Sequence, residues 1–233
     1  MRKIRLSQDR GRTQHDGVDA RHTFSTGQYL DPNHMGFGPL RAVDEEHILP
    51  GAGYAAREYA NMERVTIVLE GELEYRDSLG GLAKLTSGDL QCVSCGTGVR
   101  FSVANASSSA PLHSYTSWFI PGCDDLPPAY QNASFPMDSW DQHWLALASP
   151  DGRDGSLKLS RDIILYGASL TKSKMLNHTL NPNRGAWLQV IDGSIQSGGE
   201  TLSKGDGLAI EHETDLTVEA VSDARLLLFD LDL

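Results

Sequence analysis

Histidine and cysteine are the side chains of this sequence best suited to metal or redox chemistry, and their spacing limits that chemistry. No two of the eight histidines stand in a His-x-His or His-x-x-x-His arrangement, which would place two imidazoles on one face of an element. Transition-metal sites need clustered donors, so isolated histidines predict surface or hydrogen-bonded structural roles instead. The eight are His15, His22, His34, His47, His113, His143, His178 and His212.

The cysteines offer a second route to chemistry. Cys92 and Cys95 have the Cys-x-x-Cys spacing found in zinc ribbons and thioredoxins, but no second pair completes a zinc site and the motif follows a predicted strand. Residues three apart on a strand face opposite sides, about 10 Å apart, which is too far for a disulfide. A turn at Gly96 could bring Cys95 back toward Cys92. We therefore expect reduced thiols and keep both as candidate redox residues.

Cys123 stands between an apolar stretch and two aspartates, Asp124 and Asp125, so we expect it to be the most exposed thiol. Exposure favours oxidation, whereas the adjacent carboxylates raise a thiol pKa and slow thiolate chemistry. Two hypotheses follow: Cys123 senses redox state, or it is a loop cysteine with no role.

The elements that carry these residues are predicted to be short strands. The chain has 23 glycines and 10 prolines scattered among alternating apolar stretches, which favours a turn-rich all-β protein. Residues 68–73 (VLEGEL) reappear as 190–195 (VIDGSI), and 85–89 (LTSGD) reappear as 202–206 (LSKGD). Chance similarity of two hairpins is the alternative, but two matched turns in the same order predict tandem jelly-roll barrels.

Prolines and polar residues interrupt the strand pattern between Pro127 and Pro150, so the join is expected there. We divide the chain into an N-terminal domain, residues 1–130, and a C-terminal domain, residues 131–233.

The formal net charge of -11, with no basic cluster, argues against direct nucleic-acid binding. No apolar run approaches the roughly 20 residues needed to span a bilayer. The basic N-terminus lacks a following apolar segment, which predicts a cytoplasmic protein.

Several segments together resemble the pirin family of bicupins, proteins with two tandem cupin barrels. They are residues 21–25 (RHTFS), 31–38 (DPNHMGFG), 69–78 (LEGELEYRDS) and 148–156 (ASPDGRDGS). The resemblance covers most of the chain and implies an all-β fold of two cupin (jelly-roll β-barrel) domains.

The resemblance also implies a metal site, because active pirins hold one iron with a His-x-His pair and a later His-x-Glu pair. The matching positions here are Arg57, Tyr59, Phe101 and Val103, which are poor or impossible iron ligands. We therefore interpret the chain as a branch with a degenerate metal site and no cofactor. In the second half, the repeat places Thr179 and Asn181 at the ligand positions, with His178 expected to point away.

The four residues are expected to line a pocket, where a buried Arg57 would need a partner. That partner could be Glu58 or Glu63, open solvent at the barrel mouth, or an anionic small molecule.

Three functions follow. The first is a non-catalytic pirin-like protein that binds an anionic small molecule or a protein partner, with a redox-responsive cysteine. The alternative is a quercetin 2,3-dioxygenase-type metal-dependent oxygenase, as in active pirins. The third is a metal-free enzyme using Arg57 and Tyr59. The emptied positions favour the first and argue against an enzyme.

Overall fold

The computed structural model describes residues 1–233 as strands joined by turns and three short 3-10 helices, η1 (Ser7–Asp9), η2 (Met137–Trp140) and η3 (Arg153–Gly155). The strands of the first half are β1 (Arg2–Arg5), β2 (Gly11–His15), β3 (Val18–His22), β4 (Leu40–Ile48), β5 (Gly53–Tyr59), β6 (Glu63–Glu70), β7 (Glu72–Asp77), β8 (Leu82–Thr86), β9 (Asp89–Ser94), β10 (Val99–Asn105), β11 (Leu112–Phe119) and β12 (Ala129–Ser134). Those of the second half are β13 (Leu145–Ser149), β14 (Leu157–Lys158), β15 (Ile163–Leu170), β16 (Met175–Thr179), β17 (Arg184–Asp192), β18 (Ser194–Ser197), β19 (Glu200–Ser203), β20 (Gly207–Glu211), β21 (Asp215–Ala220) and β22 (Ala224–Asp232).

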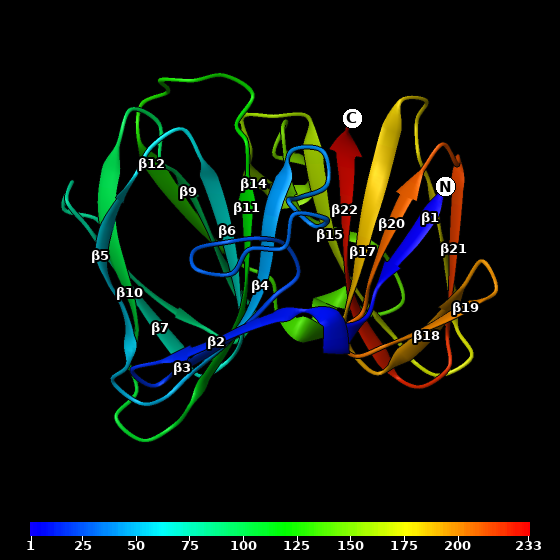
Figure 1. Cartoon of the computed structure of the whole chain (residues 1–233), viewed down its shortest axis with the longest axis horizontal. Helices are drawn as coiled ribbons and strands as arrows, with labels where there is room; N and C mark the ends of the chain where they lie inside the picture. The colour runs from blue at the N-terminus through cyan, green and yellow to red at the C-terminus, as the bar shows by residue number, and fades with distance from the viewer.

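These strands form two barrels that lie side by side (Figure 1). Each barrel combines one seven-stranded and one four-stranded sheet. The first barrel has the sheets β12-β9-β6-β11-β4-β3-β2 and β5-β10-β7-β8, and the second has β1-β20-β17-β22-β15-β13-β14 and β16-β21-β18-β19. The two large sheets face each other in the middle of the molecule, and the small sheets form the outer walls. The predicted all-β bicupin architecture is confirmed.

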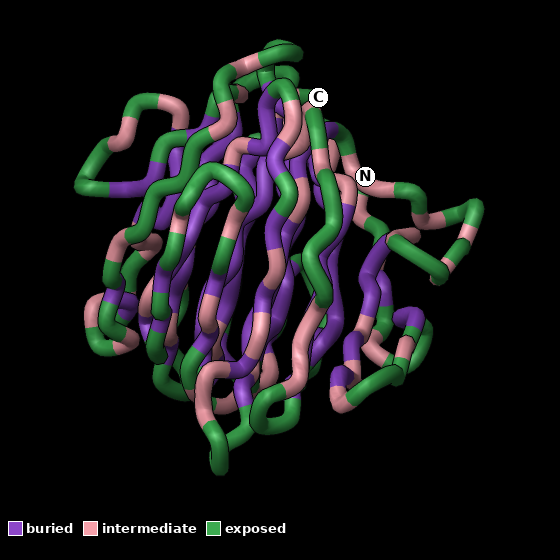
Figure 2. Tube along the Cα trace, turned by 90° about the vertical axis from the view of Figure 1, so that its left-hand side faces the viewer, coloured by how far each residue is buried: buried purple, intermediate pink, exposed green.

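The burial of each strand follows from its place in this arrangement. In β10, Val99, Phe101 and Val103 are buried and point into the first barrel, while Arg100 on the other face is exposed. Nearly every residue of β6 is buried, because one face of that strand looks into the barrel and the other into the interface. Viewed from the side of the first barrel, exposed positions lie at the turns and along the outer strands in front, and buried positions run along the strands behind them (Figure 2).

The repeated motifs take equivalent structures in the two barrels. Gly71 and Gly193 turn the chain after β6 and β17 with φ of 84° and 76°, a conformation that favours glycine. At the second corner, Asp89 accepts a hydrogen bond from the Thr86 amide at 2.8 Å. Asp206 accepts the matching bond from the Ser203 amide, also at 2.8 Å. The glycine and Gly-Asp turns predicted from the repeated motifs are therefore present at equivalent positions in the two barrels.

The chain crosses between the barrels at both ends of the first half. β1, at the start of the chain, pairs antiparallel with β20 of the second barrel, and the chain enters the first barrel at β2. β12 pairs with β9 of the first barrel from Ala129 to Ser134, so the predicted division between residues 130 and 131 falls inside this strand. No helix of the structure combines the length and the apolar character needed to cross a membrane.

Candidate functional site

The four residues at the positions suggested by the resemblance all line one cavity of about 640 Å³ inside the first barrel. β5 and β10 hold them together: Arg57 pairs with Phe101, and Tyr59 pairs with Val99. A bulge after Phe101 shifts the register, so that Val103 pairs with Tyr54. Phe101 and Val103 are buried, whereas Arg57 is exposed, so its charge is solvated and needs no buried partner.

Of the protein partners proposed for Arg57, Glu63 is committed elsewhere. Its carboxylate accepts the Ser160 amide of the second barrel at 3.0 Å and is 2% exposed. Burial raises the Glu63 pKa, and the hydrogen bonds from Ser160 oppose that rise. Glu63 therefore acts as a contact between the barrels and does not belong to the cavity.

Aromatic rings form one wall of the cavity. The ring centroid of Tyr59 lies 4.8 Å from that of Phe101 and 4.9 Å from that of Trp118. The guanidinium of Arg64 lies 5.6 Å from the centroid of Phe101 and 6.0 Å from that of Trp118, which is cation–π distance. The cavity therefore offers flat apolar surface beside a positive charge.

Polar groups from β2, β3, β4 and β11 complete the cavity. Nδ1 of His22 lies 2.8 Å from Oδ1 of Asp44, and its Nε2 lies 2.8 Å from Oγ1 of Thr13. Burial raises the pKa of Asp44 against the opposing effect of this histidine. Thr116 donates a hydrogen bond to Oε2 of Glu46 at 2.8 Å. Both nitrogens of His22 are engaged, and no three metal donors converge on this cavity.

A metal-donor cluster does exist on the opposite face of the same sheet, and the sequence analysis missed it. Glu45 and His47 are two residues apart on β4, so their side chains lie on the same face of the strand. His113 of β11 pairs directly with His47. The donor atoms of the three residues, here named the Glu45–His47–His113 group, all lie within 4.8 Å of one another. Oε1 of Glu45 is 3.1 Å from Nε2 of His113 and 3.8 Å from Nε2 of His47. The two imidazole rings stack with centroids 4.1 Å apart.

The electrostatics of this group suit a cation. Burial opposes ionisation of Glu45, but hydrogen bonds from His113, His47 and Arg10 outweigh it and hold the Glu45 pKa well below its usual range. Arg10 contacts Oε2 at 2.9 Å, which leaves Oε1 directed at the two histidines. A carboxylate with two imidazoles is the donor set of many non-haem iron oxygenases, so these residues fit a first-row metal.

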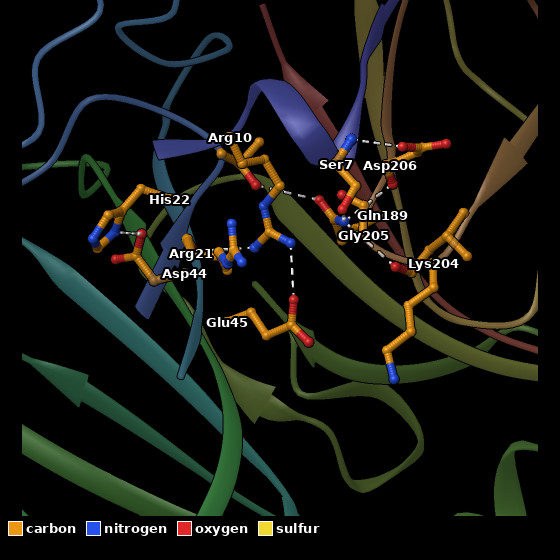
Figure 3. Close-up of polar contacts among 12 residues, drawn as sticks. Ser7, Arg10, Arg21, His22, Asp44, Glu45, Gln189, Lys204, Gly205 and Asp206 are labelled. Carbon is orange, nitrogen blue, oxygen red and sulfur yellow. Dashed lines mark hydrogen bonds and ion pairs between the residues drawn. The ribbon is translucent and has the colours of Figure 1, made fainter. Parts of the chain in front are cut away.

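The group borders a cleft of about 860 Å³ between the two barrels. Glu45 and His47 lie on one side, the turn from Ser203 to Asp206 lies on the other, and the N-terminal arm crosses between them. In the arm, the Ser7 amide donates to Oδ1 of Asp206 at 2.6 Å, and Arg10 reaches Glu45 and the Arg21 carbonyl (Figure 3). The arm thus connects the second barrel to the candidate metal ligands.

The remaining sequence-predicted residues lie apart from both sites. Cys92 and Cys95 are buried, one in the interface core and one in the core of the first barrel, while Cys123 is exposed. Burial raises the pKa of Cys95 to about 12.

The expectation that His178 points away from its barrel is wrong. Nε2 of His178 lies 2.8 Å from Oδ2 of the buried Asp230, whereas the next residue, Thr179, is exposed. The side chain of His178 therefore lies on the inner face of β16.

The fold and the site together define a bicupin with a carboxylate and two histidines as candidate metal ligands. Comparison with known proteins is more specific: the pirin family model matches residues 3–119, the model described as quercetinase C-terminal cupin domain matches residues 146–231, and the chain belongs to the pirin family.

Similar proteins include the Quercetin 2,3-dioxygenase of Escherichia coli, which is 40% identical over 98% of this chain and 97% of its own length. The pirin-like protein YhaK of the same species is 32% identical over 97% of both chains. The crystal structure of the bacterial pirin YhhW in complex with nickel(II), from Escherichia coli, has a TM-score of 0.95 at 38% identity. It covers 100% of this chain and 99% of that one.

These findings correct two predictions. The interpretation of the chain as a non-catalytic binding or regulatory protein is contradicted by full-length similarity to a protein named as a dioxygenase. The expectation of no cofactor is wrong as well, since a relative is solved with nickel(II) and this chain has its own donor group. The loss of metal-binding capacity was inferred from positions 57, 59, 101 and 103, from the lack of closely spaced histidine pairs, and from Thr179 and Asn181 in the second half. None of these tests could find Glu45, His47 and His113, which meet through strand pairing.

Proposed function

We propose that this protein is a metal-dependent oxygenase of the quercetin 2,3-dioxygenase type, with its metal held by the Glu45–His47–His113 group. The observation that carries the proposal is the convergence of one carboxylate and two imidazoles on adjacent strands. The name of the 40% identical relative supplies the reaction type and the flavonol substrate. A cytoplasmic location and a redox response of Cys123 stay predictions.

Each residue of the group has a distinct role in this proposal. Oε1 of Glu45 and the Nε2 atoms of His47 and His113 would be the ligands. Arg10 holds the second carboxylate oxygen and so fixes the orientation of Glu45, as outer-shell partners of metal ligands do. A first-row metal held by such a set supplies the chemistry by which molecular oxygen reacts with an organic substrate.

The cleft beside the group is where we place the flavonol. Its volume of about 860 Å³ falls in the range of small-molecule sites. Arg10, Arg21 and Lys204 line it, and cationic side chains favour the ionised form of a phenolic hydroxyl. His47 is exposed at the edge of the cleft, which leaves one side of the donor group open to substrate.

The proposal is tested by metal content and oxygen consumption on full-length protein that has never met a chelator. Elemental mass spectrometry should find close to one equivalent of a first-row metal, and quercetin should stimulate oxygen uptake. His113→Ala and His47→Ala should each lose most of the metal and the uptake together.

Two further variants act as controls. His143→Ala removes an exposed histidine whose Nδ1 bonds only the Asp141 carbonyl, and it should retain metal. Phe101→Leu alters the barrel cavity without touching the donor group, and it should also retain metal. Metal that persists in a His47→Ala/His113→Ala double variant would contradict the proposed site, and wild-type protein without quercetin-dependent oxygen uptake would contradict the proposed reaction.

A further inference from the structure

The barrel cavity contains a buried arginine without a counter-ion. Arg64 is 3% exposed, and its single hydrogen bond runs from Nη2 to the Thr116 hydroxyl at 3.4 Å. Nη1 is buried with no hydrogen-bond partner. The other buried arginines are paired, since Arg5 contacts Asp31 at 3.1 Å and Arg10 contacts Glu45 at 2.9 Å. A buried charge without a partner is costly, so the unpaired state of Arg64 requires an explanation.

The surroundings of Arg64 compensate its charge only in part. The faces of Phe101 and Trp118 provide weak cation–π attraction. Glu46 is connected to Arg64 only through Thr116: Arg64 donates to the Thr116 hydroxyl, which donates to the Glu46 carboxylate. Asp44, also on the cavity wall, hydrogen-bonds His22. Arg64 therefore lines a cavity of about 640 Å³ while its buried Nη1 has no hydrogen-bond partner.

We propose that this cavity binds a planar aromatic carboxylate, whose carboxylate pairs with Arg64 and whose ring stacks against Tyr59, Phe101 and Trp118. A guanidinium matches a carboxylate with two parallel hydrogen bonds, and flat rings pack well on aromatic walls. The exposed guanidinium of Arg57 at the cavity wall attracts anions toward the opening. This site goes beyond the proposed oxygenase function, because the Glu45–His47–His113 group lies on the other face of the sheet.

The charge requirement is tested by calorimetric titration of the full-length protein with 2-naphthoate and with 2-naphthamide, a neutral molecule of nearly the same shape. Naphthoate should bind at least about tenfold more tightly, the smallest ratio expected for a hydrogen bond to a charged group. Arg64→Met should abolish this preference. Arg100→Met, on the exposed face of the same strand as Phe101, should preserve it. Equal affinities of the two compounds for wild-type protein, or an unchanged preference in Arg64→Met, would overturn the proposal.

Folding and location require separate measurements. Replacing an unpaired buried charge with an apolar side chain is commonly tolerated, and circular dichroism will show whether Arg64→Met is folded. If it is not, Arg64→Lys provides the same test, because an ammonium keeps the charge but cannot form the two parallel bonds. Naphthoate should change tryptophan fluorescence in wild-type protein and lose that effect in Trp118→Phe.

A final variant separates this site from the metal site. His113→Ala should bind naphthoate with wild-type affinity, whatever its effect on metal content. A fluorescence change that survives in Trp118→Phe, or an affinity that falls in His113→Ala, would place the ligand outside the barrel cavity and refute the assignment. Failure of the oxygenase assay alone would leave these binding results intact.

Discussion

Replacing Arg10 by methionine removes one partner of a buried ion pair and leaves the other in place. Nη1 of Arg10 lies 2.9 Å from Oε2 of Glu45, and the two side chains are 1% and 9% exposed. Arg10 also donates to the Arg21 carbonyl at 3.0 Å. Methionine fills much of the same volume, so the main effect of Arg10→Met is an uncompensated carboxylate at the junction of the barrels.

The magnitude follows from the environment of Glu45. Breaking a buried pair by removing one partner costs about 3–5 kcal/mol. His113 still contacts Oε1 of Glu45 at 3.1 Å, and this hydrogen bond compensates part of the lost interaction. We therefore expect the lower end of that range, about 3 kcal/mol, in metal-free protein at neutral pH. The double variant Arg10→Met/Glu45→Gln should be more stable than Arg10→Met, because it leaves no buried charge.

Urea unfolding of chelator-treated protein, followed by both circular dichroism and fluorescence, measures this loss. Coincident transitions from the two probes establish that a single free energy of unfolding can be used for this two-barrel chain. Arg12→Met is the matched control, because its ion pair with Asp19 is 44% and 34% exposed. Solvent-exposed ion pairs contribute little to stability, so this variant should unfold close to wild type.

Two results would refute the reasoning. If Arg10→Met lost no more free energy of unfolding than Arg12→Met, the buried pair would not stabilise the junction. If the double variant were as unstable as the sum of its single variants, the two side chains would act independently. Partial restoration of Arg10→Met by added nickel would independently indicate that a cation can take over the role of the guanidinium.

Two further predictions concern single buried or exposed groups. Burial raises the folded-state pKa of Glu63 above its ordinary value of 4.5, so the folded protein binds this proton more tightly and its stability falls as pH rises from 4.5 through the folded pKa. Glu63→Gln should remove that part of the decline in unfolding experiments between pH 4 and neutrality, and an identical pH profile would contradict it. Cys123 is exposed whereas the other two thiols are buried. Mass spectrometry after brief alkylation should therefore find one modified cysteine in folded protein and none in Cys123→Ser, and rapid labelling of all three would contradict the structure.

Most of the fold was predictable from local patterns. The paired glycine turns at Gly71 and Gly193 indicate two barrels because few residues other than glycine adopt positive φ without strain. The alternation around Phe101 identifies an inward-facing strand. The alignment of the two halves was harder to predict to the exact residue. A shift of one residue at His178 moves its side chain to the other face of the strand, and the repeated motifs alone did not exclude such a shift.

The candidate metal group was harder to predict, because its members are distant in the chain. Glu45 and His47 are two residues apart on one strand, a spacing that places both side chains on one face and is a usable signal. His113 joins them only because β11 pairs with β4 in a particular register. A search limited to histidine pairs close in sequence does not find such a group.

By itself, the sequence determined the strand pattern, the glycine corners and the twofold repeat, since these depend on side-chain alternation and backbone conformation within a few residues. Tertiary structure decided which distant residues meet. Strand pairing brings His113 to Glu45, packing buries Arg64 while Arg57 stays in solvent, and β1 crosses to the second barrel. These outcomes depend on contacts between residues far apart in the chain, and local sequence does not encode the register or packing that creates them.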